Sequence, residues 1–301
     1  MRAETISEQL FFTTCHLAAR SPDGNWVGTG FIYAIETTVG TAHFLVTNKH
    51  VLQGAANLTI RLIQNDGAGA PLLGKATQIT VTDFSEIAWV GHPDPKVDVA
   101  VMSLHTVLTA MEDGGAPAFF RSVSPELCLG VGSTVEFDAL EEVTFIGYPS
   151  GLFDSENFLP IARKGTTATP IEVDYEGSPA FLIDASVFPG SSGSPVFIVN
   201  KGMHTDRAGN TTIGSRIACI GVLAAVHTRP VEGEVENVST RLVASFNEPI
   251  DLGVVYKSRC FDECAQVLIE GSGLVRVTST SAISEDSAPS DADATIEASG
   301  Q

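Results

Sequence analysis

The chain has 301 residues, a hydrophobic fraction of 44%, and 17 basic against 36 acidic residues, which gives a formal net charge of −19. This length suffices for one large domain or two small ones with a buried core, and the apolar content excludes a chain that is disordered throughout. The acidic balance repels nucleic-acid phosphates and anionic membrane surfaces, so we expect neither as a partner and attribute the acidity to a solvated surface.

The N-terminal segment and the cysteines indicate the compartment. The first ten residues contain acids and no continuous apolar run, so they do not resemble a secretory signal. No uncharged apolar run approaches the length that spans a membrane. The five cysteines form an odd set without a disulfide framework, which is typical of a reducing compartment. The sequence therefore predicts a soluble, cytoplasmic protein.

Short β-branched runs recur between Gly, Asn, Asp and Pro turns over most of the chain, as in an all-β sandwich or a pair of barrels. In the first half the predicted strands cover residues 11–19, 27–35, 43–47, 58–63, 78–82 and 87–90. The stretch Met-Glu-Asp-Gly-Gly-Ala-Pro at 111–117 interrupts this pattern and is the best candidate for a linker. In the second half the predicted strands cover 134–137, 143–146, 161–168, 180–183, 195–199, 217–225 and 242–245, with 201–214 as a polar hairpin.

The last part of the chain predicts a helix and a tail. Asn-Glu-Pro-Ile at 247–250 is typical of a helix start, apolar residues follow, and Gly271 and Gly273 would end the helix. Cys260 and Cys264 would share one face of this helix. Because no second His/Cys pair has matching spacing, we expect a core face there and predict no metal or cofactor. Residues 277–301 are acidic and contain no Lys or Arg, so we expect a disordered, solubilising tail.

The run Phe-Pro-Gly-Ser-Ser-Gly-Ser-Pro at 188–195 carries the most informative chemical signal. A serine framed by glycines suits an acyl-transfer nucleophile, and we place that nucleophile at Ser192. The backbone N–H groups of Gly190 and Ser192 would supply an oxyanion hole. The apolar run at 196–199 predicts a strand that would hold the turn rigid.

A serine hydroxyl needs a histidine base and a carboxylate that orients this base. His50 follows the strand predicted at 43–47, and Asp98 opens an apolar strand pattern at 98–104. His43 lies inside a strand pattern, and His92 and Asp94 lie in a Pro-containing loop, so we prefer His50 and Asp98. Each of these residues alone has an ordinary explanation as a loop histidine, a turn cap or part of a flexible turn. Their joint occurrence favours a triad.

Three blocks together resemble a known family. Thr-Asn-Lys-His-Val at 47–51, Asp-Val-Ala-Val at 98–101 and Gly-Ser-Ser-Gly-Ser-Pro at 190–195 look like the catalytic blocks of the chymotrypsin-like (trypsin-like) serine peptidases, in that family's order. The likeness is strongest to the bacterial branch with the high-temperature-requirement and glutamyl endopeptidase proteases. Gly-Thr-Gly-Phe-Ile at 28–32 and Gly-Tyr-Pro at 147–149 agree with it, and the likeness extends over roughly residues 8–270.

This resemblance implies the fold and the activity. The expected fold is all-β, with two six-stranded antiparallel β-barrels and a C-terminal helix packed on the second barrel. The peptidase domain would span 8–275, with the first barrel at 8–110, the second barrel plus helix at 118–275, and no PDZ domain. The implied activity is that of a serine endopeptidase that cleaves protein or peptide substrates through an acyl-enzyme, with His50, Asp98 and Ser192 as the triad. Ser191 stands where zymogens carry an aspartate, so we expect no activation by insertion of a new N-terminus.

The resemblance also suggests the specificity pocket. Its base lies about six residues before the nucleophile, near Ser186, and its wall is the strand after the nucleophile block. The wall positions are Leu223, Ala224, Ala225 and Val226. Asp184 is out of register to pair with a basic substrate side chain, and Leu223 stands where glutamyl-specific relatives carry histidine. We therefore expect a small or medium apolar P1 residue such as Ala, Val or Leu.

Two readings from other classes stay open. A catalytically silent module of the same fold could bind peptides or a partner protein. An esterase or transferase could use the same triad on another acyl group. The chain has no Gly-x-Ser-x-Gly elbow followed by Asp and His, which argues against the α/β-hydrolase form of that second alternative.

Overall fold

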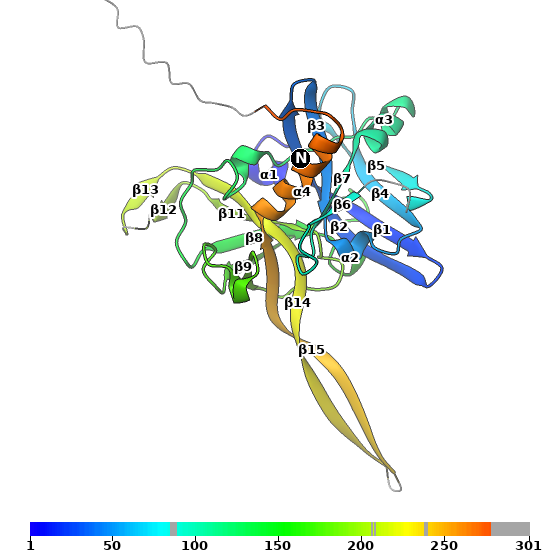
Figure 1. Cartoon of the computed structure of the whole chain (residues 1–301), viewed down its shortest axis with the longest axis vertical. Coiled ribbons are helices and arrows are strands. Elements are labelled where there is room, and N and C mark those ends of the chain that lie inside the picture. Colours follow the sequence, from blue (N-terminus) through cyan, green and yellow to red (C-terminus); the bar gives the residue numbers. More distant parts are fainter. Residues whose placement is uncertain (85–88, 206, 208, 238–239, 278–301) are drawn as a thin grey trace, which may run out of the picture.

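The first half of the chain forms an antiparallel sheet. The computed structural model describes residues 1–84, 89–205, 207, 209–237 and 240–277, and of residues 225–250 it describes the backbone alone. Seven strands of the first half pair in the order β5-β4-β1-β2-β3-β7-β6 (Figure 1). They are β1 (Thr14–Ser21), β2 (Gly24–Thr37), β3 (Gly40–Thr47), β4 (Asn57–Asn65), β5 (Pro71–Val81), β6 (Trp89–Gly91) and β7 (Ala100–Ser103). The sheet has one strand more than expected, and its closure into a barrel stays a prediction.

The second half contains a closed six-stranded barrel in the order β10-β15-β14-β11-β8-β9, as predicted. Its strands are β8 (Glu142–Gly147), β9 (Ile161–Thr167), β10 (Ala180–Asp184), β11 (Pro195–Asn200), β14 (Arg216–Asn237) and β15 (Thr240–Lys257). The polar hairpin expected at 201–214 is present as β12 (Met203–Thr205) paired with β13 (Thr211–Ile213). Alternate apolar residues of β8, β10 and β11, among them Val143, Ile183 and Val196, belong to one buried hydrophobic cluster.

Short helices connect the strands. They are α1 (Ile6–Leu10), α2 (Lys49–Leu52), α3 (His105–Asp113) and α4 (Ser258–Gly271), with 3₁₀ turns η2 (Pro125–Leu127), η3 (Pro149–Gly151) and η4 (Tyr175–Gly177). Among the described residues, none of the helices has the length and apolar character needed to cross a membrane. The predicted linker at 111–117 begins as the last turn of α3, and its two glycines follow the helix.

The helix prediction near the C-terminus was wrong at its start. Residues 247–257 belong to β15, which pairs with β10 and β14, and α4 begins only at Ser258. Pro249 suggested a first helical turn, but the apolar run around 252–256 fills a central strand of the barrel, and tertiary pairing overrides the local signal. The strand predicted at 134–137 is also absent. The acidic tail beyond residue 277 lies outside the described residues.

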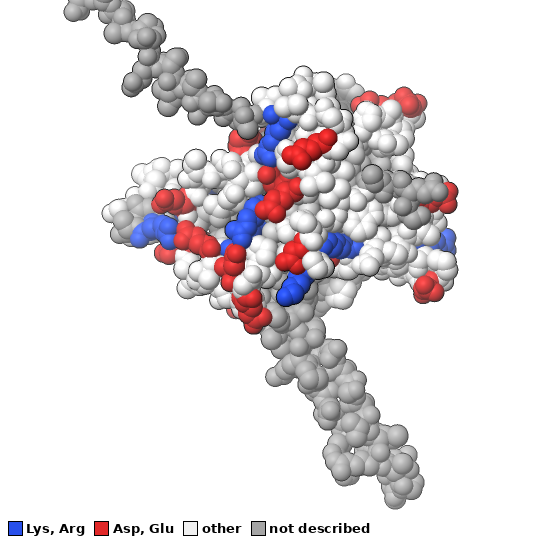
Figure 2. Space-filling view, in the orientation of Figure 1, with Lys and Arg blue, Asp and Glu red and all other residues white. Residues whose placement is uncertain are grey.

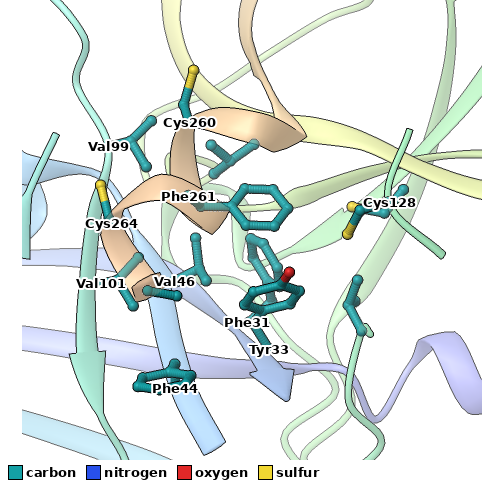
Figure 3. Packing of buried hydrophobic residues seen from close by; sticks show 14 of the residues in the cluster. Phe31, Tyr33, Phe44, Val46, Val99, Val101, Cys128, Cys260, Phe261 and Cys264 are labelled. Atoms are coloured by element: carbon teal, nitrogen blue, oxygen red, sulfur yellow. The ribbon is translucent and has the colours of Figure 1, made fainter. Parts of the chain in front are cut away.

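Helix α4 packs between the two halves rather than on the second barrel alone. Its residues Cys260, Phe261 and Cys264 lie in one buried cluster with residues of β2, β3 and β7 and with Val222 of β14. Figure 3 shows Phe261 pointing toward Phe31 and Tyr33, and the Phe31 and Phe261 rings meet edge to face at a centroid distance of 5.2 Å. The predicted core face with Cys260 and Cys264 is confirmed.

The segment after α4 is tied back to the first sheet by a partly buried ion pair. Asp262 accepts a hydrogen bond from the Tyr33 hydroxyl at 2.5 Å and pairs with Arg276 at 2.8 Å. The backbone around Arg276 forms a bridge with Thr37 at the end of β2. The C-terminal segment therefore ties α4 to strand β2 of the first sheet.

Charged side chains of both signs lie next to each other on the face in Figure 2, and most of that face is uncharged. Asp174 pairs with Lys257 at 2.5 Å and with Arg259 at 2.8 Å. The surface therefore carries local ion pairs beside its net negative charge.

Candidate active site

His50 and Asp98 lie 48 positions apart in the chain and meet at the end of the first sheet. His50 belongs to the short helix α2, directly after β3, and Asp98 lies just before β7. The Nδ1 atom of His50 is 2.5 Å from Oδ2 of Asp98, and the backbone N–H of His50 donates to Oδ1 at 3.1 Å. Half of the imidazole surface stays exposed, against 29% of the Asp98 side chain. The Asp98 carboxylate thus contacts the Nδ1 side of the His50 ring, and half of the ring surface stays accessible to solvent.

The environment of Asp98 favours its charged form. Partial burial by itself raises the pKa of this carboxyl. Hydrogen bonds from the His50 ring and from the backbone N–H groups of His50 and Lys49, together with the charge of His50, outweigh burial and bring the pKa below its ordinary value. Asp98 is therefore an anion at neutral pH and fixes the proton of His50 on Nδ1.

Neighbouring residues hold this pair in place, and the sequence analysis did not single them out. Asn48 donates from Nδ2 to the backbone carbonyl of Asp98 at 2.6 Å. The Lys49 ammonium donates to the carbonyl of His92 at 2.7 Å and so braces the loop before Asp98. From the second half, the Tyr256 hydroxyl donates to a carbonyl in the same loop at 2.8 Å. Asn48 and Lys49 belong to the same Thr-Asn-Lys-His-Val block as His50, and this position next to the histidine is the sequence signal that could have identified them.

The serine block contains three hydroxyls, and their burial separates them. Ser191 and Ser194 are 1% and 0% exposed, and neither hydroxyl has a hydrogen-bond partner in the described part of the chain. Ser192 is only partly buried, and its Oγ donates to the carbonyl of Ala224 at 2.9 Å. Of the three, Ser192 is therefore the residue that a reagent can reach.

The turn around Ser192 needs glycine on both sides. Gly190 has φ = +86°, and a Cβ there would lie 2.6 Å from the carbonyl oxygen of Tyr148. Gly193 has φ = +89°, and its Cβ would lie 1.9 Å from the carbonyl oxygen of Thr29. Both the left-handed backbone and the close approach exclude a side chain. The glycines in this block thus have a packing reason as well as the chemical one inferred from the sequence.

Along the same turn, every second backbone N–H group donates a hydrogen bond to a backbone carbonyl. Ser191 N–H donates to the carbonyl of Phe188 at 3.0 Å, and Gly193 N–H donates to that of Leu223 at 2.8 Å. Within the described part of the chain, the N–H groups of Gly190 and Ser192 donate to no backbone carbonyl. These two donors are the ones that the sequence analysis assigned to an oxyanion hole.

Thr29 of β2 joins the serine block to the histidine block. Its N–H donates to the carbonyl of Ser192 at 2.9 Å, and its hydroxyl donates to the carbonyl of Gly190 at 2.8 Å. Its own carbonyl accepts a hydrogen bond from the Thr47 hydroxyl at 2.7 Å, three positions before His50. The Gly-Thr-Gly-Phe-Ile motif predicted a strand here, but it did not indicate that Thr29 would form hydrogen bonds to both blocks.

The histidines that the sequence analysis set aside have structural contacts. The His43 ring packs edge to face on Phe120, and burial, which outweighs the charge of Glu36, lowers its pKa. The His92 ring pairs with Glu263 of α4 at 3.1 Å. Asp94 caps its own loop by accepting from the N–H of Lys96 at 2.9 Å.

The residues assigned to the specificity pocket lie after β10 and on β14, and of these Leu223 and Ala224 bond to the serine block. Ser186 is partly buried after β10, and Asp184 is exposed at the end of that strand. Leu223 is fully buried in the barrel cluster and Ala224 is 2% exposed, so at these positions the backbone rather than a long side chain can border a substrate. Ala225 and Val226 continue β14, and their side chains lie outside what the structure describes.

The described residues include no group of three or more His, Cys, Asp or Glu side chains arranged to hold a metal ion. All five cysteines are free and buried. The histidine and aspartate blocks thus supply an imidazole paired with a carboxylate, and the serine block supplies an accessible hydroxyl and two backbone N–H groups that donate to no carbonyl among the described residues.

Residues 28–202 match the sequence profile of a known family, described as the trypsin-like peptidase domain. The chain belongs to this family. Its members are serine-type endopeptidases, as the resemblance of the three blocks implied. The matched range extends from the strand that carries Thr29 through the serine block, so it includes all the site residues described above except those of β14 and β15.

Solved structures of several proteases resemble this chain at low sequence identity. The HtrA-type protease AlgW, solved with a tripeptide, is 18% identical, with a TM-score of 0.45. The alignment covers 88% of this chain and 62% of AlgW, so this chain matches less than two thirds of that protein's length.

Two further structures are similar to the same degree. A serine endoprotease from Yersinia pestis is 15% identical, with a TM-score of 0.46 and coverage of 89% and 68%. A thermostable serine protease from an extremophilic microorganism is 14% identical, with a TM-score of 0.46 and coverage of 86% and 97%. A comparison with curated proteins gives no match.

Proposed function

We propose that this chain hydrolyses peptide bonds with Ser192 as nucleophile, His50 as general base and Asp98 as the group that orients the base. The carrying observation is the 2.5 Å contact between His50 Nδ1 and Asp98 Oδ2, which pairs a half-exposed imidazole with a carboxylate. We place the cleft between the two halves, each closed as a barrel, so that the triad is assembled from both.

The first step requires one rotation. The Ser192 hydroxyl donates to the Ala224 carbonyl at 2.9 Å in the resting protein. In the proposed step the hydroxyl turns away from this carbonyl and donates to Nε2 of His50, which would take the proton as Oγ attacks the scissile carbonyl. The resulting imidazolium then protonates the leaving amine, and a water activated by His50 hydrolyses the acyl-enzyme.

The free N–H groups of Gly190 and Ser192 would bind the oxyanion of the tetrahedral intermediate. Thr29 supports this role, because its hydrogen bonds to the carbonyls of both residues fix the orientation of their peptide groups. The loss of one such donor in other hydrolases lowers kcat by roughly 10²–10³. The positive φ of Gly190 keeps the turn in the shape that presents both donors.

We further propose a small or medium apolar P1 residue. Ser186, Leu223 and Ala224 bring no charge to the pocket, and Asp184 is exposed to solvent at the end of β10. A charged P1 side chain would therefore lose its hydration without gaining a partner. A cleavage profile dominated by Arg, Lys or Glu at P1 would contradict this specificity.

The resting contact between Ser192 and Ala224 is the one observation that favours the alternative, a silent module that only binds peptides. A fluorophosphonate probe separates the two functions, because it reacts only with an activated serine. A silent module would bind peptide with no reaction at Ser192.

The test compares probe labelling and casein hydrolysis in the wild type and three variants. Ser192→Ala should abolish labelling and reduce hydrolysis by about 10⁶, as removal of the serine does in subtilisin, and His50→Ala should behave similarly. Ser191→Ala is the matched control, because this neighbouring hydroxyl is buried and has no partner among the described residues. Loss of labelling in Ser191→Ala, or labelling that survives Ser192→Ala, would remove Ser192 from the mechanism.

A further inference from the structure

Strands β14 and β15 extend beyond the barrel as a two-stranded arm. β11 pairs with β14 only as far as Val222, and β10 pairs with β15 only from Leu252 onward. Residues 228–237 of β14 and 240–249 of β15 pair with each other, and within the described part of the chain no other strand pairs with them. Figure 1 shows this arm leaving the barrel with no other described element beside it. Both faces of the arm are therefore uncovered.

The register of the arm gathers its apolar residues on one face. Successive residues of a strand lie on opposite faces, and two residues that pair across the strands share a face. On one face, three pairs in a row are apolar, and we call these six residues the apolar strip. They are Val231 with Phe246, Gly233 with Ala244, and Val235 with Leu242.

The opposite face of the arm is polar and acidic, so the arm is amphipathic. The pairs on that face include Glu232 with Ser245, Glu234 with Val243 and Glu236 with Arg241. A two-stranded ribbon alone is at best marginally stable in water, and it gains stability when an apolar face is packed against another layer. The apolar strip therefore requires a cover, and no described element supplies one.

The order of residue sizes along the apolar strip fits a second copy of the same strip. A pair of large residues lies at each end, and the small pair Gly233 and Ala244 lies at the centre. A half-turn about an axis through the small pair places each large pair opposite the other large pair of the second copy. A twofold interface requires a surface that matches itself in this way. The small pair also lets two twisted ribbons approach closely where they cross.

The position of the strip within the arm sets the direction of the two arms. Gly233 lies near the middle of the β14 part of the arm, residues 228–237. Antiparallel arms that cross there place the outer end of each arm beside the base of the other. Packed sheet faces lie about 10 Å apart. Parallel arms at that spacing would bring two barrels into the same space, because the barrel is wider than the arm (Figure 1).

We propose that the apolar strip is a dimerisation surface, on which the arms of two copies of this chain pack face to face and antiparallel about a twofold axis at Gly233 and Ala244. The acidic faces then stay in solvent. Six residues on each side are fewer than the roughly 20–30 of a standard interface, so we expect a dissociation constant of about 1–100 µM. Both copies carry a net charge of −19, so salt should strengthen the dimer by screening their repulsion. The dimer involves none of the proposed catalytic residues.

The test measures the oligomeric state of the full chain by sedimentation velocity over a concentration series through the expected range. Val235→Gln and Val243→Gln are a matched pair, because the two valines lie on opposite faces of the arm and the substitution is the same. A third variant has residues 229–248 replaced by Asn-Gly, which closes the hairpin between Thr228 and Pro249 with a two-residue turn. The midpoint of urea unfolding checks that each variant keeps the fold of the barrel.

The wild type and Val243→Gln should dimerise alike, and added salt should tighten both dimers. Val235→Gln should weaken the dimer by about 30-fold or more, because each dimer then covers two amides that lose their hydration. The shortened arm should give a monomer at every concentration.

A cysteine cross-link tests the geometry in an otherwise unchanged strip. The antiparallel arrangement places residue 244 of one copy opposite residue 244 of the other. Ala244→Cys should therefore form a covalent dimer under oxidised glutathione, which takes up the two electrons and two protons that the pair of thiols loses. Val243→Cys, on the acidic face, is the control and should stay a monomer in denaturing electrophoresis. The five native cysteines are buried.

Several outcomes would overturn the inference. A wild type that stays monomeric throughout the series would refute the dimer, and a dimer that persists in the shortened arm would place the interface elsewhere. Equal weakening by Val235→Gln and Val243→Gln, or equal cross-linking by the two cysteine variants, would show that the strip is not the interface. A monomer that binds vesicles of neutral phosphatidylcholine, and loses this binding in Val235→Gln, would assign the strip to a lipid surface.

Discussion

Gly193→Ala tests whether the close contact between the serine block and β2 determines the site. The new Cβ would lie 1.9 Å from the Thr29 carbonyl oxygen and 2.5 Å from the Thr47 hydroxyl, at a backbone φ of +89°. Ordinary contact distances require a separation of about 1.5 Å more from the carbonyl. Because that oxygen belongs to backbone in the centre of a sheet, the serine block itself must move.

The cost can be worked out from the contacts that such a movement breaks. The left-handed φ costs an alanine about 1 kcal/mol. The displacement also stretches the hydrogen bonds from Thr29 N–H to Ser192, from Gly193 N–H to Leu223 and from the Thr47 hydroxyl to Thr29. At about 1 kcal/mol for each of these three hydrogen bonds, and with the conformational cost of the left-handed φ added, the total loss of stability is about 4 kcal/mol. Labelling of Ser192 should fall by more than about 100-fold, because the oxyanion donors move with the turn.

Gly202→Ala is the matched control. This glycine follows β11 with φ = +80°, and a Cβ there would meet nothing within 4 Å. It should lose only the conformational cost of about 1 kcal/mol, with unchanged labelling. Urea unfolding and the rate of fluorophosphonate labelling measure both variants. A stability loss in Gly193→Ala within about 1 kcal/mol of the control, with labelling intact, would refute the argument from the close approach.

Two further predictions concern the carboxylates. Asp98→Asn should lower kcat by roughly 10⁴ with an unchanged circular dichroism spectrum, because the amide favours the wrong imidazole tautomer, as in the equivalent trypsin variant. The pKa of Asp98 is lower in the folded protein than in the unfolded chain, where it is about 3.9. The Asp98 carboxylate therefore stabilises the fold fully above that pH, and this stabilisation is lost as the pH falls through the lower pKa of the folded state. The stability difference between wild type and Asp98→Asn should therefore shrink in acid, and a difference that grows there would contradict the assignment. Asp262→Ala should destabilise the protein by about 3 kcal/mol in urea, because it leaves Arg276, which is 19% exposed, without its carboxylate. Tyr33→Phe removes one hydrogen bond and should cost about 1 kcal/mol, so equal losses in the two variants would show that the ion pair does not anchor the C-terminal segment.

Local signals were sufficient for most strands of both halves. Alternation of apolar and polar residues, as in β4, where Leu58, Ile60 and Leu62 are buried, follows directly from the pleat of a half-buried strand. The same local logic failed where packing outweighs it. Pro249 favoured a helix start but lies in a barrel strand, and α3 was not predicted, although its buried residues Val107 and Met111 stand four positions apart.

The sequence by itself determined the family and the chemical groups of the site. The glycines, the serine run and the histidine and aspartate blocks are short motifs whose residues are neighbours in the chain, so their spacing is visible without coordinates. Only the tertiary structure decided which groups meet. It pairs His50 with Asp98, directs the Ser192 hydroxyl to Ala224 and places α4 between the two halves. Each of these depends on contacts between segments far apart in the chain, and the packing of the whole fold determines such contacts.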